Sequence, residues 1–145
     1  MNHLKLFEYF DNFPKILDES YDYGNVRAVI HNELSYVENW FSKYFDQENQ
    51  ELIIEKLLSM DSDPFPIAFL NNVNVEDEYR GQGYGNSIYE YYENWATSNG
   101  ANYSILVADV DETQQDGFDL NKWYESYEYE KIGQLYDNNV YFKAF

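Results

Sequence analysis

The chain contains no cysteine, which excludes a disulfide framework, a thiolate metal site and a cysteine nucleophile. It also has no apolar run of membrane-spanning length, and no long apolar stretch follows the lysine at position 5. Its 145 residues are enough for one domain with a single core. We therefore expect a single-domain, soluble, cytoplasmic protein with no membrane partner.

Positive charge is scarce. Nine Lys and Arg residues stand against 27 Asp and Glu residues, and the formal net charge is −18. This balance disfavours direct binding to nucleic acids and anionic membranes, which attract clusters of Lys and Arg. It favours cationic partners such as small amines, polyamines or basic protein segments. An acidic surface that serves only solubility is the alternative.

Glycine is also uncommon, yet three of the seven glycines are Gly81, Gly83 and Gly85. The β-type run 67–75 precedes them and the helical pattern 86–97 follows. The first N–H groups of a helix lack internal partners, and the helix dipole adds positive potential there. Glycine lets a ligand approach the backbone and permits positive φ. We therefore predict that this turn binds an anion.

Two common phosphate motifs do not fit the turn. A P-loop needs a lysine after its last glycine, but Gly85 is followed by Asn86 and Ser87. The dinucleotide fingerprint needs a third glycine where Asn86 stands.

The spacing Arg80-x-x-Gly83-x-Gly85 instead resembles the acyl-CoA pyrophosphate signature of the GNAT N-acetyltransferase superfamily. The flanking segment 75–85 resembles the end of that family's motif strand, with aspartate at the usual proline. Residues 123–133 resemble its tyrosine-containing segment. The resemblance covers about residues 65–145.

The resemblance implies an α/β fold with a central mixed sheet and helices on both faces. Residues 63–145 would form the acetyl-CoA-binding part. The local patterns there predict four strands and two helices. The expected strands are 67–75, 103–108, 129–135 and 140–145, and the expected helices are 86–97 and 118–127.

Residues 1–62 form an atypical, helix-rich part. Apolar residues recur at helical spacing between Leu34 and Met60, and 25–31 is the clear strand candidate ahead of residue 60. A usual family member has about three strands and two helices ahead of the motif strand. Only the six residues Asp61 to Pro66 separate the helical run from that strand. We expect strands to be missing or their order to be altered.

The resemblance also assigns roles at the cofactor turn, with acetyl-CoA as the co-substrate. The strand residues Val73 and Val75 would offer backbone groups to the pantetheine arm and the thioester carbonyl. Arg80 and Gly81 would shape the turn. Backbone N–H groups would bind the pyrophosphate from Gln82, Gly83, Tyr84, Gly85 and Asn86.

Direct attack by an amine needs a base, donors for the oxyanion and an acid for the departing thiolate. The motif alignment assigns the acid role to Tyr124, and an alternative frame assigns it to Tyr129. Glu76 and Glu78, near the strand end, are the candidates for the base, acting through water. The asparagine that the family carries upstream of the tyrosine falls near Gly117.

No metal is expected. Asp109, Asp111 and Asp116 resemble a calcium loop, but Gln114 stands where that loop requires glycine. His3 and His31 have no partner motif, so we expect both to be structural or exposed.

The sequence thus predicts an acetyl-CoA-dependent N-acetyltransferase that acts on a primary amine of an unidentified, cationic acceptor. A homodimer is left open. The alternative is a GNAT-fold binding protein with little or no turnover, such as an acidic inhibitor that imitates DNA. The intact glycine turn favours the enzyme, because a DNA mimic has no need of a pyrophosphate site.

Overall fold

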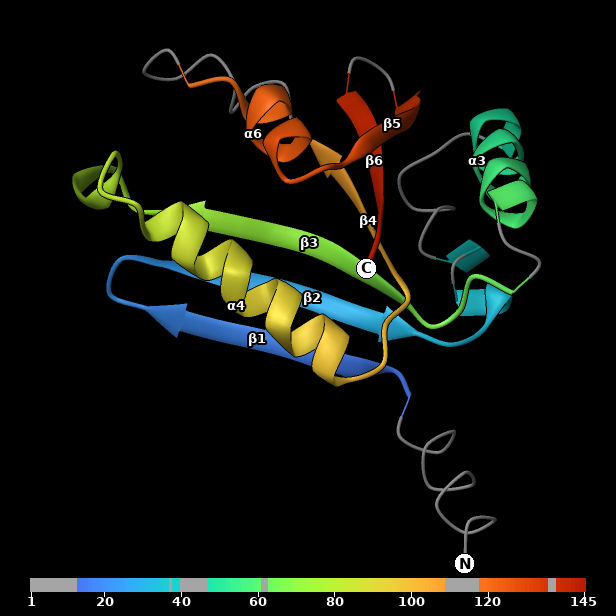
Figure 1. Ribbon diagram of the computed structural model, residues 1–145, viewed down its shortest axis with the longest axis horizontal. Helices are drawn as coiled ribbons and strands as arrows, with labels where there is room; N and C mark the ends of the chain where they lie inside the picture. The colour runs from blue at the N-terminus through green and yellow to red at the C-terminus, as the bar shows by residue number, and fades with distance from the viewer. Residues whose placement is uncertain (1–12, 37, 40–46, 61–62, 109–117, 136–137) are drawn as a thin grey trace, which may run out of the picture.

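The computed structural model describes residues 13–36, 38–39, 47–60, 63–108, 118–135 and 138–145 (Figure 1). The described helices are α3 (Gln47–Met60), α4 (Tyr84–Ser98) and α6 (Leu120–Ser126), with a 3₁₀ turn at Asp77–Tyr79. The strands are β1 (Lys15–Tyr21), β2 (Gly24–His31), β3 (Ile67–Val75), β4 (Tyr103–Ala108), β5 (Glu130–Leu135) and β6 (Asn138–Ala144).

The six strands form one mixed sheet in the order β1-β2-β3-β4-β6-β5. β3 and β4 are parallel neighbours, and every other neighbouring pair is antiparallel. The parallel pair is joined through α4, which Figure 1 shows lying across β1, β2 and β3. The mixed sheet expected from the sequence is confirmed.

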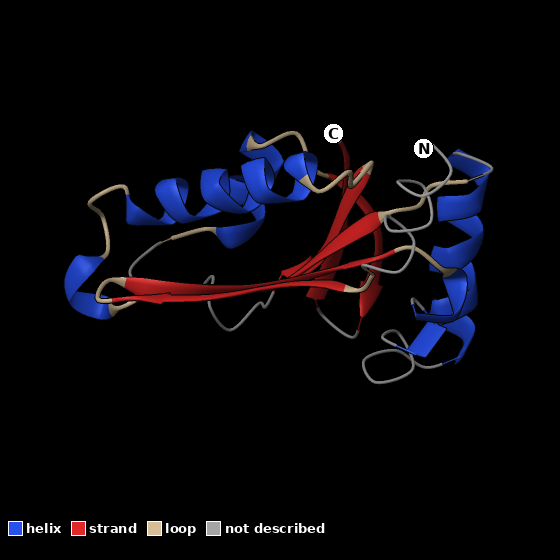
Figure 2. Ribbon diagram, turned by 90° about the horizontal axis from the view of Figure 1, so that it is seen from below, coloured by secondary structure: helices blue, strands red, loops and turns tan. Residues whose placement is uncertain are grey.

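The helices cover opposite faces of the sheet because side chains alternate along the strands. In β3, Ala68 and Leu70 belong to the core that includes buried residues of α4 and α6. Ile67 and Phe69 point to the other face and pack in a second core with residues of α3. Figure 2 shows the helix layer along the long strands and α3 apart from it.

The described N-terminal part contains two strands ahead of α3. The sequence predicts one strand ahead of residue 60, but the structure has the antiparallel hairpin β1–β2 there, and the hairpin precedes α3. β1 lies at the sheet edge and has a single buried residue, Leu17. Its sequence therefore lacks the apolar alternation that would reveal it. In the described residues, β3 follows the helical part directly, without a strand between them.

Most boundaries agree with the sequence to within two residues. α4 begins at Tyr84, earlier than expected, because Gly83 caps it with φ 87°. α4 ends at Ser98, one residue later than expected, and Gly100 just beyond it has φ 84°. Asn138 and Asn139, which precede the strand expected at 140–145, belong to β6. No helix in the described part of the chain combines the length and apolar character needed to cross a bilayer.

Candidate active site

The parallel strands β3 and β4 separate before β3 ends. They pair only from Ile67–Tyr103 to Leu70–Leu106, whereas β3 stays paired with β2 as far as Val75. One extra residue of β3, Asn71, lies where the register with β2 shifts. Such a bulge bends a strand and increases its twist. The last residues of β3 therefore border an opening on the side where β4 would otherwise continue.

The glycine turn lies at the end of this opening. Gly81 has φ 77° and Gly83 has φ 87°, and both values are in the left-handed region that favours glycine. Gly83 is the N-cap of α4 and makes no side-chain capping bond. The first N–H groups of α4 have no partner within the helix. A Cβ atom at Gly81 or Gly83 would have open space within 4 Å. The backbone here is accessible to a ligand.

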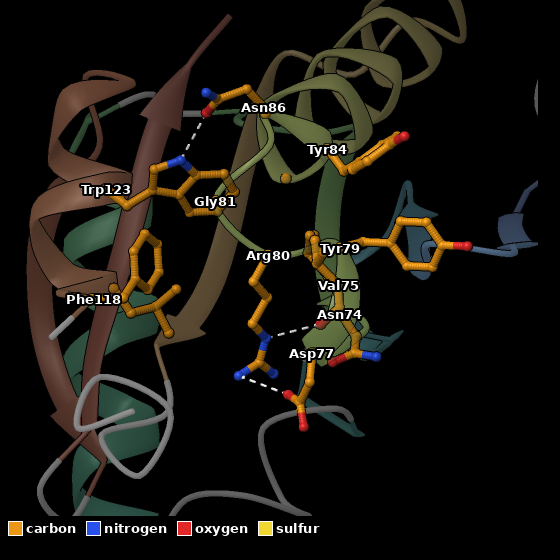
Figure 3. Close-up of a pocket in the computed structure, with 14 residues that line it drawn as sticks. Asn74, Val75, Asp77, Tyr79, Arg80, Gly81, Tyr84, Asn86, Phe118 and Trp123 are labelled. Atoms are coloured by element: carbon orange, nitrogen blue, oxygen red, sulfur yellow. Dashed lines mark hydrogen bonds and ion pairs between the residues drawn. The ribbon is translucent and has the colours of Figure 1, made fainter. Parts of the chain in front are cut away.

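A cavity of about 730 Å³ joins the turn to the strand opening. One wall is the end of β3, and the other is formed by side chains on and just before α6 (Figure 3). The rings of Tyr79 and Tyr84 extend to the side of the turn away from Trp123. The lining residues in the described part are Val73, Asn74, Val75, Asp77, Tyr79, Arg80, Gly81, Gly83, Tyr84, Gly85, Asn86, Phe118, Leu120 and Trp123.

The cofactor residues predicted from the sequence lie around this cavity, with the exception of Gln82. Gln82 is exposed, and its side chain donates to the Glu78 carbonyl oxygen at 3.2 Å. Arg80 donates from Nε to the Val75 carbonyl oxygen at 3.0 Å and pairs through Nη1 with Asp77 at 3.1 Å. The arginine thus contacts the turn itself. Whether these residues bind the cofactor stays a prediction.

The aromatic wall of the cavity, formed by Phe118 and Trp123, was not predicted from the sequence. Phe118 is 48% exposed, and its ring lies 6.1 Å from that of Trp123, measured between centroids. The Trp123 indole N–H donates to Asn86 Oδ1 at 2.8 Å. Both residues fall within the helix expected at 118–127. Their placement against the glycine turn depends on how α6 packs on α4, which local periodicity does not reveal.

The two candidate bases lie apart from the cavity wall. Glu76 and Glu78 are exposed and are not among the described lining residues. Glu76 Oε1 accepts from the Asn74 side chain at 3.5 Å, and its backbone N–H donates to the Tyr23 carbonyl oxygen at 2.9 Å. Asn74 lines the cavity, so the Glu76 side chain contacts a lining residue.

The two candidate acids differ in their surroundings. Tyr124 is 6% exposed and its ring packs 4.9 Å from that of Trp123. The Tyr129 hydroxyl lies in a buried cluster, 3.0 Å from Tyr89 OH and 2.7 Å from Ser104 Oγ. Burial raises the Tyr129 pKa well above its ordinary value. Both tyrosines belong to the same buried core and neither is among the described lining residues, but Tyr124 also adjoins Trp123 of the cavity wall.

The remaining candidates are the two histidines, the residues that resemble a calcium loop, and Gly117. His31 is buried beside Tyr36 and Phe69, as expected for a structural histidine. His3, Asp109, Asp111, Gln114, Asp116 and Gly117 lie outside the described residues. Within the described residues, no group of three or more His, Cys, Asp or Glu side chains could hold a metal ion.

Comparison with known proteins adds a family to this geometry. The family model for the acetyltransferase (GNAT) family matches residues 34–125, more than half of the chain. The sequence resemblance begins near residue 65, whereas the family-model match begins at residue 34 and includes α3. The hairpin β1–β2 lies outside it. A comparison with curated proteins gives no significant match.

Three solved structures share the fold. An acetyltransferase from Bacillus cereus matches with a TM-score of 0.54 at 12% identity, over 99% of this chain and 89% of that one. Arylalkylamine N-acetyltransferase 2 from Aedes aegypti has 0.51 at 12%, over 83% and 67%. Arabidopsis thaliana Naa50, in complex with the bisubstrate analogue CoA-Ac-MVNAL, has 0.50 at 13%, over 85% and 66%. These likenesses concern the fold alone.

Proposed function

The chain belongs to the acetyltransferase (GNAT) family, and we propose that it transfers an acetyl group from acetyl-CoA to a primary amine by direct attack. The observation that carries the proposal is the accessible glycine turn at the end of the β3–β4 opening. Backbone N–H groups at a helix start bind phosphate groups. The strand opening beside them gives an extended arm with amide groups a place to lie.

Each part of the cavity has a role in this proposal. The N–H groups of Gly83, Tyr84, Gly85 and Asn86 hold the pyrophosphate, and the Gln82 N–H does so from the preceding position. Arg80 and Gly81 keep the turn in shape. The backbone of Val73 and Val75 holds the pantetheine arm. Acetyl-CoA, when bound, supplies the activated acetyl thioester.

Proton transfer is assigned to side chains near the cavity. Tyr124 is the acid that protonates the departing thiolate, and its position beside Trp123 of the cavity wall supports this role. Glu76 takes the amine proton through water, supported by its contact with the lining residue Asn74. Glu78 is the second candidate base. General acid–base catalysis of this kind contributes about a hundred- to ten-thousand-fold to a rate.

The acceptor class is proposed from the charge of the chain. One fold relative is named an arylalkylamine N-acetyltransferase. Another is a complex with the bisubstrate analogue CoA-Ac-MVNAL. The net charge of this chain is −18, which attracts cations over long range. A primary amine that carries further positive charge, such as a polyamine or a basic protein segment, fits best.

Calorimetry with acetyl-CoA, followed by mass spectrometry of an amine panel, tests the proposal. The panel would contain spermidine, an arylalkylamine and a lysine-rich peptide. We expect acetyl-CoA to bind at one site per chain and at least one cationic amine to gain an acetyl group. Binding without transfer to any amine would favour the alternative of a binding protein. Failure to bind acetyl-CoA would overturn the assignment of the turn.

A further inference from the structure

A single amide oxygen joins the start of α4 to α6. Asn86 lies three residues after the N-cap Gly83. Its Oδ1 accepts from Trp123 Nε1 at 2.8 Å and from Tyr127 OH at 2.7 Å. Trp123 lies in α6, and Tyr127 is the residue that caps its C-terminal end. Figure 3 shows the bond between Asn86 and Trp123 at the edge of the cavity.

The Trp123 indole also lies beside Gly85. A Cβ atom at Gly85 would lie 3.8 Å from Cζ2 of Trp123, which is ordinary van der Waals contact. Cζ2 and Nε1 lie along the same edge of an indole. The Asn86 bond therefore holds this edge of the ring against the start of α4, where Gly85 leaves room beside it. Trp123 lines the cavity from this position.

The chemistry of the two donors fixes the amide. An indole N–H can donate but has no lone pair to accept with, so it requires an acceptor at position 86. Because the Asn86 amide oxygen faces the two hydrogen-bond donors of the α6 segment, its NH₂ group faces away from them. A flipped amide would set that NH₂ against the indole N–H. The bonds therefore specify both the presence and the orientation of an acceptor.

We propose that the Asn86 side chain is a positioning residue, which holds the Trp123 indole in place as a wall of the acetyl-CoA cavity. This role rests on the proposed function and is separate from the backbone N–H of Asn86, which is assigned to the pyrophosphate. Trp123 is the residue that contacts the bound donor. Because Tyr124 adjoins Trp123 on α6, the same tie orients the helix that carries the proposed acid.

Two variants at position 86 separate this role from a general effect on the fold. Asn86→Leu has a similar size but no acceptor. Asn86→Asp keeps oxygen acceptors for both donors and adds a negative charge beside the pyrophosphate site. Each variant would be titrated by calorimetry with acetyl-CoA, and by displacement with S-acetylpantetheine, which lacks the phosphates. Thermal unfolding would report on the fold, and Tyr127→Phe would remove one donor only.

We expect Asn86→Leu to weaken the binding of acetyl-CoA and of S-acetylpantetheine by about three- to tenfold, the range that the net loss of about one hydrogen bond gives. Asn86→Asp should bind S-acetylpantetheine as the wild type does, but acetyl-CoA more weakly, because its carboxylate repels the phosphates. Tyr127→Phe should have a smaller effect than Asn86→Leu. S-acetylpantetheine therefore isolates the acceptor role from the charge, because it lacks the phosphates: retained binding by Asn86→Asp and weakened binding by Asn86→Leu would trace the effect to the hydrogen-bond acceptor at position 86.

The proposal is overturned if Asn86→Leu, still folded, binds both donors like the wild type. It is also overturned if Asn86→Asp weakens S-acetylpantetheine as much as Asn86→Leu does. In both cases a wild type that binds acetyl-CoA leaves the proposed function standing. A wild type that binds neither donor overturns the proposed function and this inference together.

Discussion

Arg80 and Val75 form a hydrogen bond across the turn that follows β3. The Arg80 Nε donates to the Val75 carbonyl oxygen at 3.0 Å, and its Nη1 pairs with Asp77 at 3.1 Å. Among the described residues that line the cavity, Arg80 is the only cation. The residue best suited by charge to meet a phosphate therefore contacts the backbone and a carboxylate of its own turn.

The Arg80–Asp77 pair gives the first prediction. Asp77→Asn removes the carboxylate that offsets the arginine charge, so acetyl-CoA should bind about two- to fivefold more tightly, as expected for a partly exposed ion pair. Arg80→Gln should weaken binding, because it loses both the charge and the Nε donor to Val75. Calorimetry at low salt measures both. Weaker binding by Asp77→Asn would indicate that the ion pair itself maintains the turn.

Gly83 and Gly85 should respond in opposite ways to alanine. Gly83 has φ 87°, a conformation that costs a non-glycine residue about 1–2 kcal/mol. Gly85 lies in α4, and a Cβ atom there would meet Val75 and Trp123 at 3.7 and 3.8 Å. Gly83→Ala should lower the melting temperature and weaken acetyl-CoA binding. Gly85→Ala should leave both near wild type or raise stability, since alanine favours a helix.

The test compares the two variants in melting temperature and in acetyl-CoA affinity. Calorimetric unfolding and acetyl-CoA titration of the two variants form a matched pair, since each adds one methyl group. Equal losses in both would mean that the conformation of Gly83 does not set the turn. Gly85→Leu serves as a positive control, because a larger side chain would displace the Trp123 ring.

Tyr124 and Tyr129 should differ in what their loss affects. Tyr124→Phe keeps the ring but removes the proposed acid, so kcat should fall about a hundred- to ten-thousand-fold while acetyl-CoA affinity stays constant. Tyr129→Phe removes the hydrogen-bond partner of the buried Tyr89 hydroxyl and one of the two partners of Ser104 Oγ, which keeps its bond to Tyr92 OH. It should therefore lower the free energy of unfolding by about 1–3 kcal/mol.

Steady-state kinetics and urea unfolding of both variants check this contrast. If Tyr129→Phe lowers kcat at intact stability while Tyr124→Phe does not, the acid role moves to Tyr129. If neither variant changes kcat, water protonates the thiolate.

Salt should act on the two substrates in opposite directions. The chain carries −18, so it repels the anionic cofactor and attracts a cationic acceptor over long range. Added salt screens both effects. We expect the Kd for acetyl-CoA to fall as sodium chloride rises, and kcat/KM for a polyamine to fall as well, with kcat little changed. A salt-independent kcat/KM would leave the acidity as a solubility feature.

The cofactor half of the fold could be predicted from local patterns, because β3, the glycine turn and α4 each carry their own signal. β1 could not, since an edge strand with one buried residue is stabilised by pairing with β2 rather than by its own alternation. The lining role of Trp123 was equally hidden. It depends on the bond to Asn86, which is 37 positions away in sequence.

His31 makes a prediction about pH that concerns stability rather than catalysis. The side chain is 9% exposed, its ring lies 5.1 Å from Tyr36 and 5.4 Å from Phe69, and its buried Nδ1 has no hydrogen-bond partner among the residues that the structure describes. Burial lowers the His31 pKa from 6.5 to about 4. Between these two pH values the unfolded chain binds a proton at this position and the folded chain does not. The free energy of unfolding should therefore decrease as pH falls from 6.5 to about 4, by at most about 3 kcal/mol. Carboxylates titrate in the same range, so the measurement is the difference between the wild type and His31→Phe, which keeps an aromatic ring but cannot titrate. In urea unfolding from pH 7 to pH 4, the wild type should lose stability relative to His31→Phe as the pH falls.

Parallel curves for the two proteins would show that His31 is protonated equally in the folded and unfolded chains.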